Sequence, residues 1–235
     1  MTDVILIRGA WVLTQGPAGD LADAAVAVQG RRIAEVGSFA ELRGRHPAAE
    51  VVGDGTGIVT PGFVNAHTHL SEALATGMGS ELPLEAWGSQ LIGPLGAVLT
   101  AEDAREGTRL RAVELLLSGV TTVNDMFVHY NPDEQASLGV VEGLVSAGLR
   151  GVVSFGTEDA GSPAWGPVER MLDEHDALAA AAAASDGLVS FRYGIGTLLG
   201  QTDAMLERGI AHAAGRGWAV HTHLHETRAE LEAAV

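Results

Sequence analysis

From residue 61 onward, short apolar segments alternate with longer helical stretches, and this alternation limits the possible folds more than any other feature. The strand candidates are residues 63–66, 120–124, 151–155, 188–193 and 219–223. Between them lie helical stretches at 104–117, 134–147, 167–184 and 202–214. Thr100 and Asp103 have the spacing of a helix start, and Ser118-Gly119 marks its end. Strands that alternate with helices predict a parallel sheet or a β/α barrel.

The first 60 residues have a different pattern and predict a separate, strand-rich domain. The expected short strands are 3–8, 11–14, 24–28, 31–36 and 50–53, with turns at Gln29-Gly30 and at 54–57. We therefore predict domains at 1–60 and 61–235.

Composition excludes several kinds of chemistry. The formal net charge is -16, and the acidic residues are scattered, which argues against nucleic acid binding. The chain has no cysteine, and all 14 basic residues are arginine. Disulfides, thiolate metal sites, Schiff bases and carbamylated lysine are therefore excluded. A metal ion would have to be held by histidine and carboxylate groups.

Neither a signal peptide nor a membrane span is predicted. The N-terminus has no basic segment followed by an apolar one, and no run of about 18 apolar residues occurs. We expect no membrane partner and a cytoplasmic location.

Histidines gather at the ends of two predicted strands. His67 and His69 would point to one face of the first strand, and His221, His223, His225 and Glu226 follow the fifth. The two clusters would meet at the mouth of a barrel, where active sites lie, and suit a zinc or iron site. The alternative is that they are ordinary hydrogen-bonded polar residues. Three histidines in the second cluster cannot all be ligands.

Four motifs carry a resemblance to a known family. They are PGFVNAHTHL (61–70), LPLEAW (82–87), GVTTVNDMF (119–127) and HTHLHET (221–227). Together they resemble the amidohydrolase superfamily, in its mononuclear branch of adenosylhomocysteine/methylthioadenosine deaminases and triazine chlorohydrolases. The hairpin AVAVQGRRIAEVG (25–37) resembles part of that family's small β-sandwich.

The resemblance implies a metal-dependent hydrolase of the deaminase type. His67, His69 and His223 would bind one divalent metal ion, zinc in preference to iron, and Glu226 would be the catalytic acid/base. The metal would lower the pKa of bound water toward about 7, and hydroxide would attack an electron-poor carbon, at a C–N or C–Cl bond of a nitrogen-rich ring or amidine. The alternative for Glu226 is a solvated residue at a helix start.

The substrate pocket departs from the family pattern. Where nucleoside deaminases of this branch carry a glutamate and a histidine, this chain has Gly96 and Gly196. Both changes argue against a nucleoside bound in the usual way. We expect substrate contacts from Trp87, Met126 and His129, with Phe127 and Trp165 as further candidates; core packing is the alternative for the aromatic residues and Met126.

Five barrel strands are fewer than the eight of a complete barrel. The resemblance implies an incomplete TIM-type (β/α) barrel, preceded by part of a small β-sandwich, that needs a second polypeptide or a missing C-terminal segment. The alternative is a non-catalytic binding or scaffolding subunit that keeps the front half of the fold.

Overall fold

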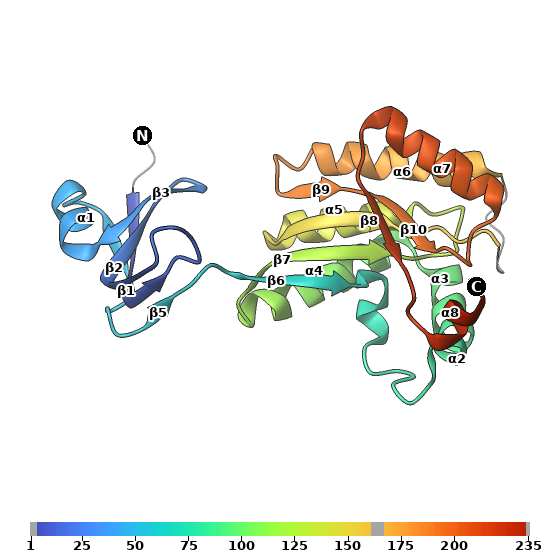
Figure 1. Cartoon of the computed structure of the whole chain (residues 1–235), viewed down its shortest axis with the longest axis horizontal. Coiled ribbons are helices and arrows are strands. Elements are labelled where there is room, and N and C mark those ends of the chain that lie inside the picture. Colours follow the sequence, from blue (N-terminus) through green and yellow to red (C-terminus); the bar gives the residue numbers. More distant parts are fainter. Residues whose placement is uncertain (1–3, 161–166, 234–235) are drawn as a thin grey trace. The chain divides into compact units, whose positions relative to one another are not determined.

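The computed structural model describes residues 4–160 and 167–233 (Figure 1). The chain divides into two compact units, Met1–Gly62 and Phe63–Val235, each with its own hydrophobic core. This division lies two residues beyond the boundary expected from the sequence. In the described part of the chain, no helix is both long and apolar enough to cross a membrane.

The first unit is built on one mixed sheet with the strand order β3-β2-β1-β4, and β5 also pairs with β1. Its elements are β1 (Val4–Leu13), β2 (Asp20–Gln29), β3 (Arg32–Ser38), α1 (Phe39–Arg45), β4 (Glu50–Val52) and β5 (Ile58–Val59). The first two predicted strands are in fact one continuous strand. Helix α1 was not expected, and it buries Leu42 in this unit's core. The described residues of this unit form a single sheet, so they do not contain the second layer of a sandwich.

The second unit contains parallel strands that follow one another in chain order. They are β6 (Phe63–Thr68), β7 (Val120–Phe127), β8 (Arg150–Phe155), β9 (Val189–Phe191), β10 (Tyr193–Thr197) and β11 (Val220–His223). One sheet has the order β6-β7-β8-β9, and β10 pairs with β11. A parallel bridge between Thr157 and Ile195 joins the two. The predicted strand 188–193 is therefore two strands, separated at Arg192, and it extends to Thr197.

Four long helices lie where the sequence predicts them. They are α4 (Ala101–Leu117), α5 (Ala136–Ala147), α6 (Val168–Ala183) and α7 (Asp203–Arg216), and in this order each packs against the next (Figure 1). The Thr100 side chain accepts a hydrogen bond from the Asp103 amide, and Asp103 in turn accepts one from the Thr100 amide. This capping box satisfies two amides at the start of α4.

The segment between β6 and α4 is more helical than its sequence suggested. It contains η1 (Leu70–Ala75), α2 (Leu84–Trp87), η2 (Gly88–Ile92) and α3 (Gly93–Val98). These elements are short, and glycines and prolines lie between or within them, so the apolar residues of the segment show no sustained helical period. A last short helix, α8 (Arg228–Ala233), follows β11.

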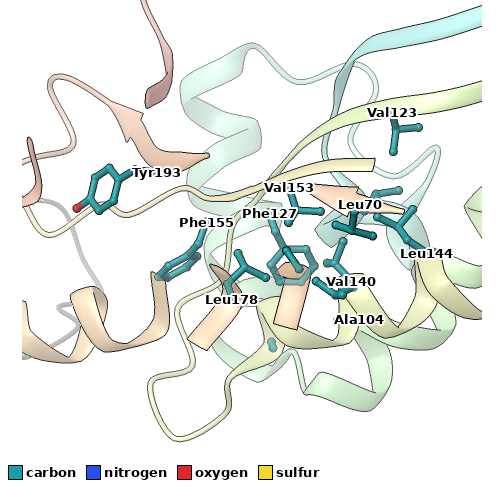
Figure 2. Close-up of a cluster of buried hydrophobic side chains, with 14 of the residues drawn as sticks. Leu70, Ala104, Val123, Phe127, Val140, Leu144, Val153, Phe155, Leu178 and Tyr193 are labelled. Atoms are coloured by element: carbon teal, nitrogen blue, oxygen red, sulfur yellow. The ribbon is translucent and has the colours of Figure 1, made fainter. Parts of the chain in front are cut away.

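The core of the second unit lies between the strands and the helices (Figure 2). Val123, Phe127, Val153 and Phe155 from β7 and β8 are at most 1% exposed, and they belong to the same buried cluster as Leu144 of α5. Burial of this apolar surface fixes the strand ends that carry the functional side chains.

The contact between α4 and α5 depends on two glycines, and this gives a stability prediction. A Cβ atom on Gly139 would lie 2.1 Å from the Ala101 carbonyl oxygen, and one on Gly143 would lie 2.6 Å from the Thr108 Cβ. We expect Gly139→Ala to lower the free energy of unfolding by about 1–3 kcal/mol, because the helices must separate. Urea denaturation measures this.

Gly215 in α7 is the matched control, because a Cβ atom there would have no neighbour within 4 Å. Gly215→Ala should leave stability unchanged or raise it by up to about 1 kcal/mol, since alanine is the better helix former. Equal effects of the two substitutions would contradict this account of the α4–α5 contact.

Candidate metal centre

Three histidines from two distant parts of the sequence converge in the second unit. His67 at the end of β6, His69 just after it and His223 at the end of β11 have ligand atoms that all lie within 4.8 Å of one another. The distance between the Nε2 atoms is 3.1 Å for His67 and His69, and 3.4 Å for His67 and His223. The structure thus brings together the three histidines that the sequence indicated as ligands.

Backbone carbonyls on neighbouring strands fix two of the three rings. The Nδ1 of His69 lies 2.8 Å from the Met126 oxygen, and the Nδ1 of His223 lies 3.1 Å from the Gly196 oxygen. Because a carbonyl only accepts, each Nδ1 must carry the hydrogen. In a neutral ring the Nε2 atom then has a free lone pair. Both rings therefore present a lone pair to the same point.

The spacing of these nitrogens fits a tetrahedral metal ion. Zinc–nitrogen bonds of about 2.0–2.1 Å place two ligand nitrogens about 3.3–3.4 Å apart. The two observed separations, 3.1 and 3.4 Å, are close to this value. Lone pairs at such distances repel one another unless a metal ion or a proton lies between them. Hydrogen bonding of the other ring nitrogen to a carbonyl is also the usual support of a metal ligand.

Burial keeps His69 in the form that binds metal. Loss of solvent, helped by charge on the neighbouring histidines, lowers the pKa of His69 to about 4 against the opposing effect of the Met126 hydrogen bond. His69 is therefore neutral at pH 7, as metal coordination requires.

Asp125 holds the chain directly after His69. This residue on β7 is fully buried, and its Oδ1 accepts a hydrogen bond from the Leu70 amide at 2.7 Å. Burial raises the pKa of Asp125 to about 8. Together with the Met126 carbonyl, Asp125 ties His69 and Leu70 to β7 on both sides of the peptide bond between them.

His221 lies outside the ligand cluster. Its Nδ1 is 2.9 Å from the Ser154 hydroxyl, and the Asn124 amide lies 3.5 Å from its Nε2. Since the Ser154 hydroxyl donates to the Asp125 carbonyl, its oxygen accepts from His221. Both nitrogens of His221 thus have partners within the sheet, which suits a supporting role.

A cavity of about 580 Å³ opens beside the histidines. Its lining includes all three of them together with two glutamates that the sequence analysis did not single out, Glu72 of η1 and Glu158 after β8. Burial raises the pKa of Glu72 to about 7. The only sequence signal for either residue was its position shortly after a predicted strand.

Glu226 lines the same cavity and is exposed. Between it and His223, His225 has a positive φ of 55°. This left-handed conformation turns the chain after β11, and histidine tolerates it better than most residues. The Glu226 amide donates to Glu230 at 2.6 Å, one residue before the Thr227 cap of α8.

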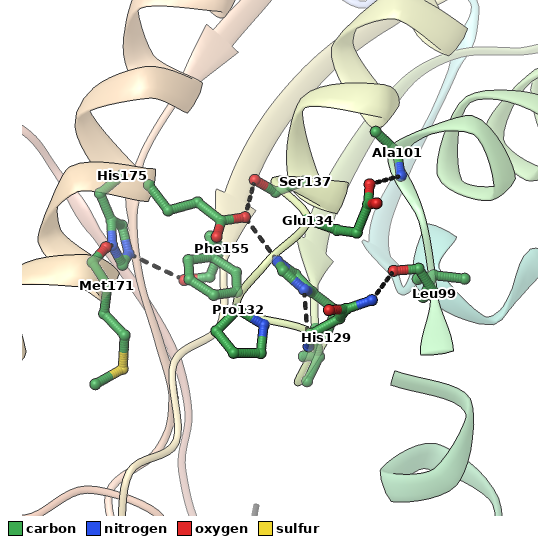
Figure 3. A network of polar contacts seen from close by, with 12 residues as sticks. Leu99, Ala101, His129, Pro132, Glu134, Ser137, Phe155, Met171 and His175 are labelled. Atoms are coloured by element: carbon green, nitrogen blue, oxygen red, sulfur yellow. Dashed lines mark hydrogen bonds and ion pairs between the residues drawn. The ribbon is translucent and has the colours of Figure 1, made fainter. Parts of the chain in front are cut away.

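Of the expected substrate contacts that fall within the described residues, only Trp87 lines the cavity. Met126 and His129 are buried and are absent from the lining, so their placement does not match the expectation that they face a substrate. His129 instead donates to Glu174 at 2.6 Å, and Ser137 donates to the same carboxylate (Figure 3). Phe127 is likewise in the core, and Trp165 lies outside the described residues.

Comparison with known proteins identifies the family. The model of the "Amidohydrolase family" matches residues 58–235, and an "Imidazolonepropionase-like composite domain, bacteria" matches residues 24–49. The chain belongs to the amidohydrolase family. A 5-methylthioadenosine/S-adenosylhomocysteine deaminase from Pelotomaculum thermopropionicum is 34% identical over 232 residues, which are 97% of this chain and 51% of that protein. The chain thus spans about half the length of this deaminase.

Solved structures agree with the family assignment. An adenosine deaminase from Xanthomonas campestris with bound zinc has a TM-score of 0.81 and 28% identity, and the match covers all of this chain and 52% of that one. Atrazine chlorohydrolase TrzN from Arthrobacter aurescens TC1, complexed with zinc, has a TM-score of 0.79 at 23% identity, covering 94% and 53%. This amidohydrolase chain therefore has the α/β fold of the family.

The geometry of the histidines predicts a metal site that single substitutions destroy. We expect metal-depleted protein to take up about one Zn²⁺ per chain. His67→Ala and His69→Ala should each weaken zinc binding by at least about a hundredfold, because loss of a metal ligand costs more affinity than loss of a residue that only hydrogen-bonds a ligand. Equilibrium dialysis with elemental analysis measures the stoichiometry and affinity.

His212→Ala is the matched control, because His212 is paired with Asp176 on the helices and is not in the cluster. It should bind zinc like the parent protein. Unchanged zinc binding in the His67 and His69 variants would refute the site.

Proposed function

We propose that this chain carries the metal centre and much of the substrate cavity of a zinc-dependent aminohydrolase. The observation that carries the proposal is the convergence of three imidazole nitrogens, 3.1 and 3.4 Å apart, in the cavity that Glu226 also lines. The deaminases among its relatives support hydrolysis of a C–N bond. The chlorohydrolase among its structural neighbours leaves a C–Cl bond as the second candidate.

The residues of the chain have separate tasks in this proposal. His67, His69 and His223 hold the ion, which when bound supplies Lewis acidity toward water and substrate. Glu226 takes a proton from the water as its oxygen adds to the substrate carbon, and it passes this proton to the substrate nitrogen that leaves as ammonia or an amine when the C–N bond breaks. Asp125 and the Met126 carbonyl keep His69 in place. Trp87 covers an apolar face of the substrate.

Glu226→Gln, made in the completed enzyme, tests the proton transfer. The substitution keeps the shape of the side chain but removes its titrating proton, so we expect turnover to fall by about a hundredfold to ten-thousandfold with zinc retained. Steady-state kinetics and elemental analysis on the same samples measure both quantities. Turnover close to that of the parent protein would return Glu226 to the role of a solvated residue at the start of α8.

The substrate is proposed to be a small nitrogen-rich ring or an amidine rather than a nucleoside. A Cβ atom on Gly96 would lie 2.8 Å from the Tyr130 ring, so the position offers no room for a longer side chain. Gly196 lines the cavity without a side chain that could bind a hydroxyl. Ribose hydroxyls would therefore lack the two partners that the family pattern places at these positions, and each hydroxyl left unpaired would cost about 1–3 kcal/mol.

We accordingly expect adenosine, methylthioadenosine and adenosylhomocysteine to be poor substrates. Their values of kcat/KM should lie at least about tenfold below those of small aminated heterocycles. One unpaired ribose hydroxyl is enough to lower kcat/KM by about tenfold. Release of ammonia from a panel of both classes measures this. Efficient deamination of any of the three nucleosides would refute the proposed substrate class.

The described strands are proposed to be the first five positions of a barrel. Within the described residues, β6 and β11 each pair with one strand only, and Phe63 and Val64 on β6 are 63% and 64% exposed. The described histidine cluster contains no carboxylate. Further strands, from a continuation of the chain or from a second polypeptide, would cover β6 and β11 and could add a ligand.

Native mass spectrometry of the protein from its source tests this completion. We expect a mass well above the 24.3 kDa of this chain, in either a longer polypeptide or a complex. Denaturing spectra of the same sample separate these two cases. A monomer of 24.3 kDa with hydrolase activity would contradict the incomplete barrel, and one that binds ligands but hydrolyses nothing would favour the scaffolding alternative.

A further inference from the structure

One carboxylate in the cavity is held in place from two sides. The Tyr130 hydroxyl donates to Oε2 of Glu158 at 3.0 Å, and the Thr197 hydroxyl donates to Oε1 at 3.2 Å. All three residues line the cavity that contains His67 and His223. Each oxygen keeps a further lone pair for a ligand, because a carboxylate has about four acceptor positions.

Glycines leave the space that Glu158 occupies. A Cβ atom on Gly196 would lie 2.7 Å from the Glu158 Cγ, and one on Gly200 would lie 2.9 Å from the same atom. Any side chain at these positions would displace the glutamate. The end of β10 and the loop after it are therefore shaped around this one carboxylate, and this packing fixes the position of Glu158 before a ligand arrives.

The charges of the cavity favour a cation. Among the described residues, its lining contains Glu72, Glu158 and Glu226 but neither arginine nor lysine. A metal ion bound by the histidines would offset negative charge close to the histidines. Glu158 is hydrogen-bonded to Tyr130 and Thr197 and does not belong to the histidine cluster, so its negative charge remains for a ligand. Trp87, Leu82 and Ile92 give the same cavity an apolar surface suited to a flat ring.

We propose that Glu158 is the specificity-determining residue of this cavity and that it selects substrates carrying a positively charged amidinium or aminated-ring group. The planar N–H donors of such a group match a carboxylate with two free lone pairs. A neutral amide of the same shape would satisfy fewer of these acceptors and would not offset the charge. This inference rests on the proposed function, because it assigns the substrate class of the same site.

Benzamidine and benzamide form the test pair, since they have nearly the same shape and only benzamidine is a cation at pH 7. Isothermal titration calorimetry gives the Kd of each for the purified protein. We expect benzamidine to bind at least about tenfold more tightly than benzamide, the size of effect expected from a charged hydrogen bond. Equal affinities would overturn the proposal.

Glu158→Gln should reduce the ratio of the two affinities by at least about tenfold. Glu85→Gln is the matched control: it makes the same charge change on α2, at an exposed residue outside the cavity lining, and should leave the ratio unchanged. A ratio that survives in Glu158→Gln, or falls equally in Glu85→Gln, would overturn the assignment to Glu158.

Two further variants decide the matter if Glu158→Gln does not fold. Tyr130→Phe and Thr197→Val keep the charge but each removes one hydroxyl that holds it. A lower affinity ratio in at least one of them supports the proposal, and an unchanged ratio in both overturns it. Circular dichroism establishes that each variant is folded.

Zinc content, measured on the same samples, separates this inference from the proposed function. Zinc bound by the protein together with equal affinity for the two probes would overturn the inference alone. A cation preference that depends on Glu158 in a protein that binds no zinc would overturn the proposed function alone.

Discussion

The register of the parallel strands is the constraint on which the site depends. The carbonyl of Met126 on β7 lies opposite His69, and the carbonyl of Gly196 on β10 lies opposite His223. Each carbonyl settles which ring nitrogen carries the hydrogen and so directs the other nitrogen inward. A shift of one residue in either strand would turn these carbonyls away. The buried core that fixes the register therefore also fixes the protonation of the ligands.

The three glutamates of the cavity are chemically distinct because their surroundings differ. Burial raises the pKa of Glu72 to about 7, so near neutral pH this carboxyl is protonated more readily than an exposed glutamate. Glu158 receives hydrogen bonds from two hydroxyls, and Glu226 is exposed beside the end of β11. A readily protonated acid, a fixed acceptor and a solvated acid can divide binding and proton transfer among them.

Local sequence signals account for most of the second unit and for the metal ligands. Strand and helix periods, the Thr100 capping box and the spacing of His67 and His69 are short-range features, and each recurs in the structure. Glu72 and Glu158 could not be found in this way, because their role depends on which surfaces the fold brings together. His129 shows the converse: a histidine after a strand suggested a ligand contact, yet Glu174, 45 residues away, binds it in the core.

Gly96 and Gly196, which replace side chains expected in nucleoside deaminases, pack against Tyr130 and Glu158. Gly96 is where a longer residue would collide with Tyr130, and Gly196 is where one would collide with Glu158. Tyr130 and Glu158 are themselves joined by a hydrogen bond of 3.0 Å. A residue able to bind ribose could therefore be restored at either position only by displacing this pair. The missing nucleoside-binding side chains and the fixed Glu158 carboxylate are thus two consequences of one packing arrangement, and the proposed preference for cationic ligands rests on that arrangement.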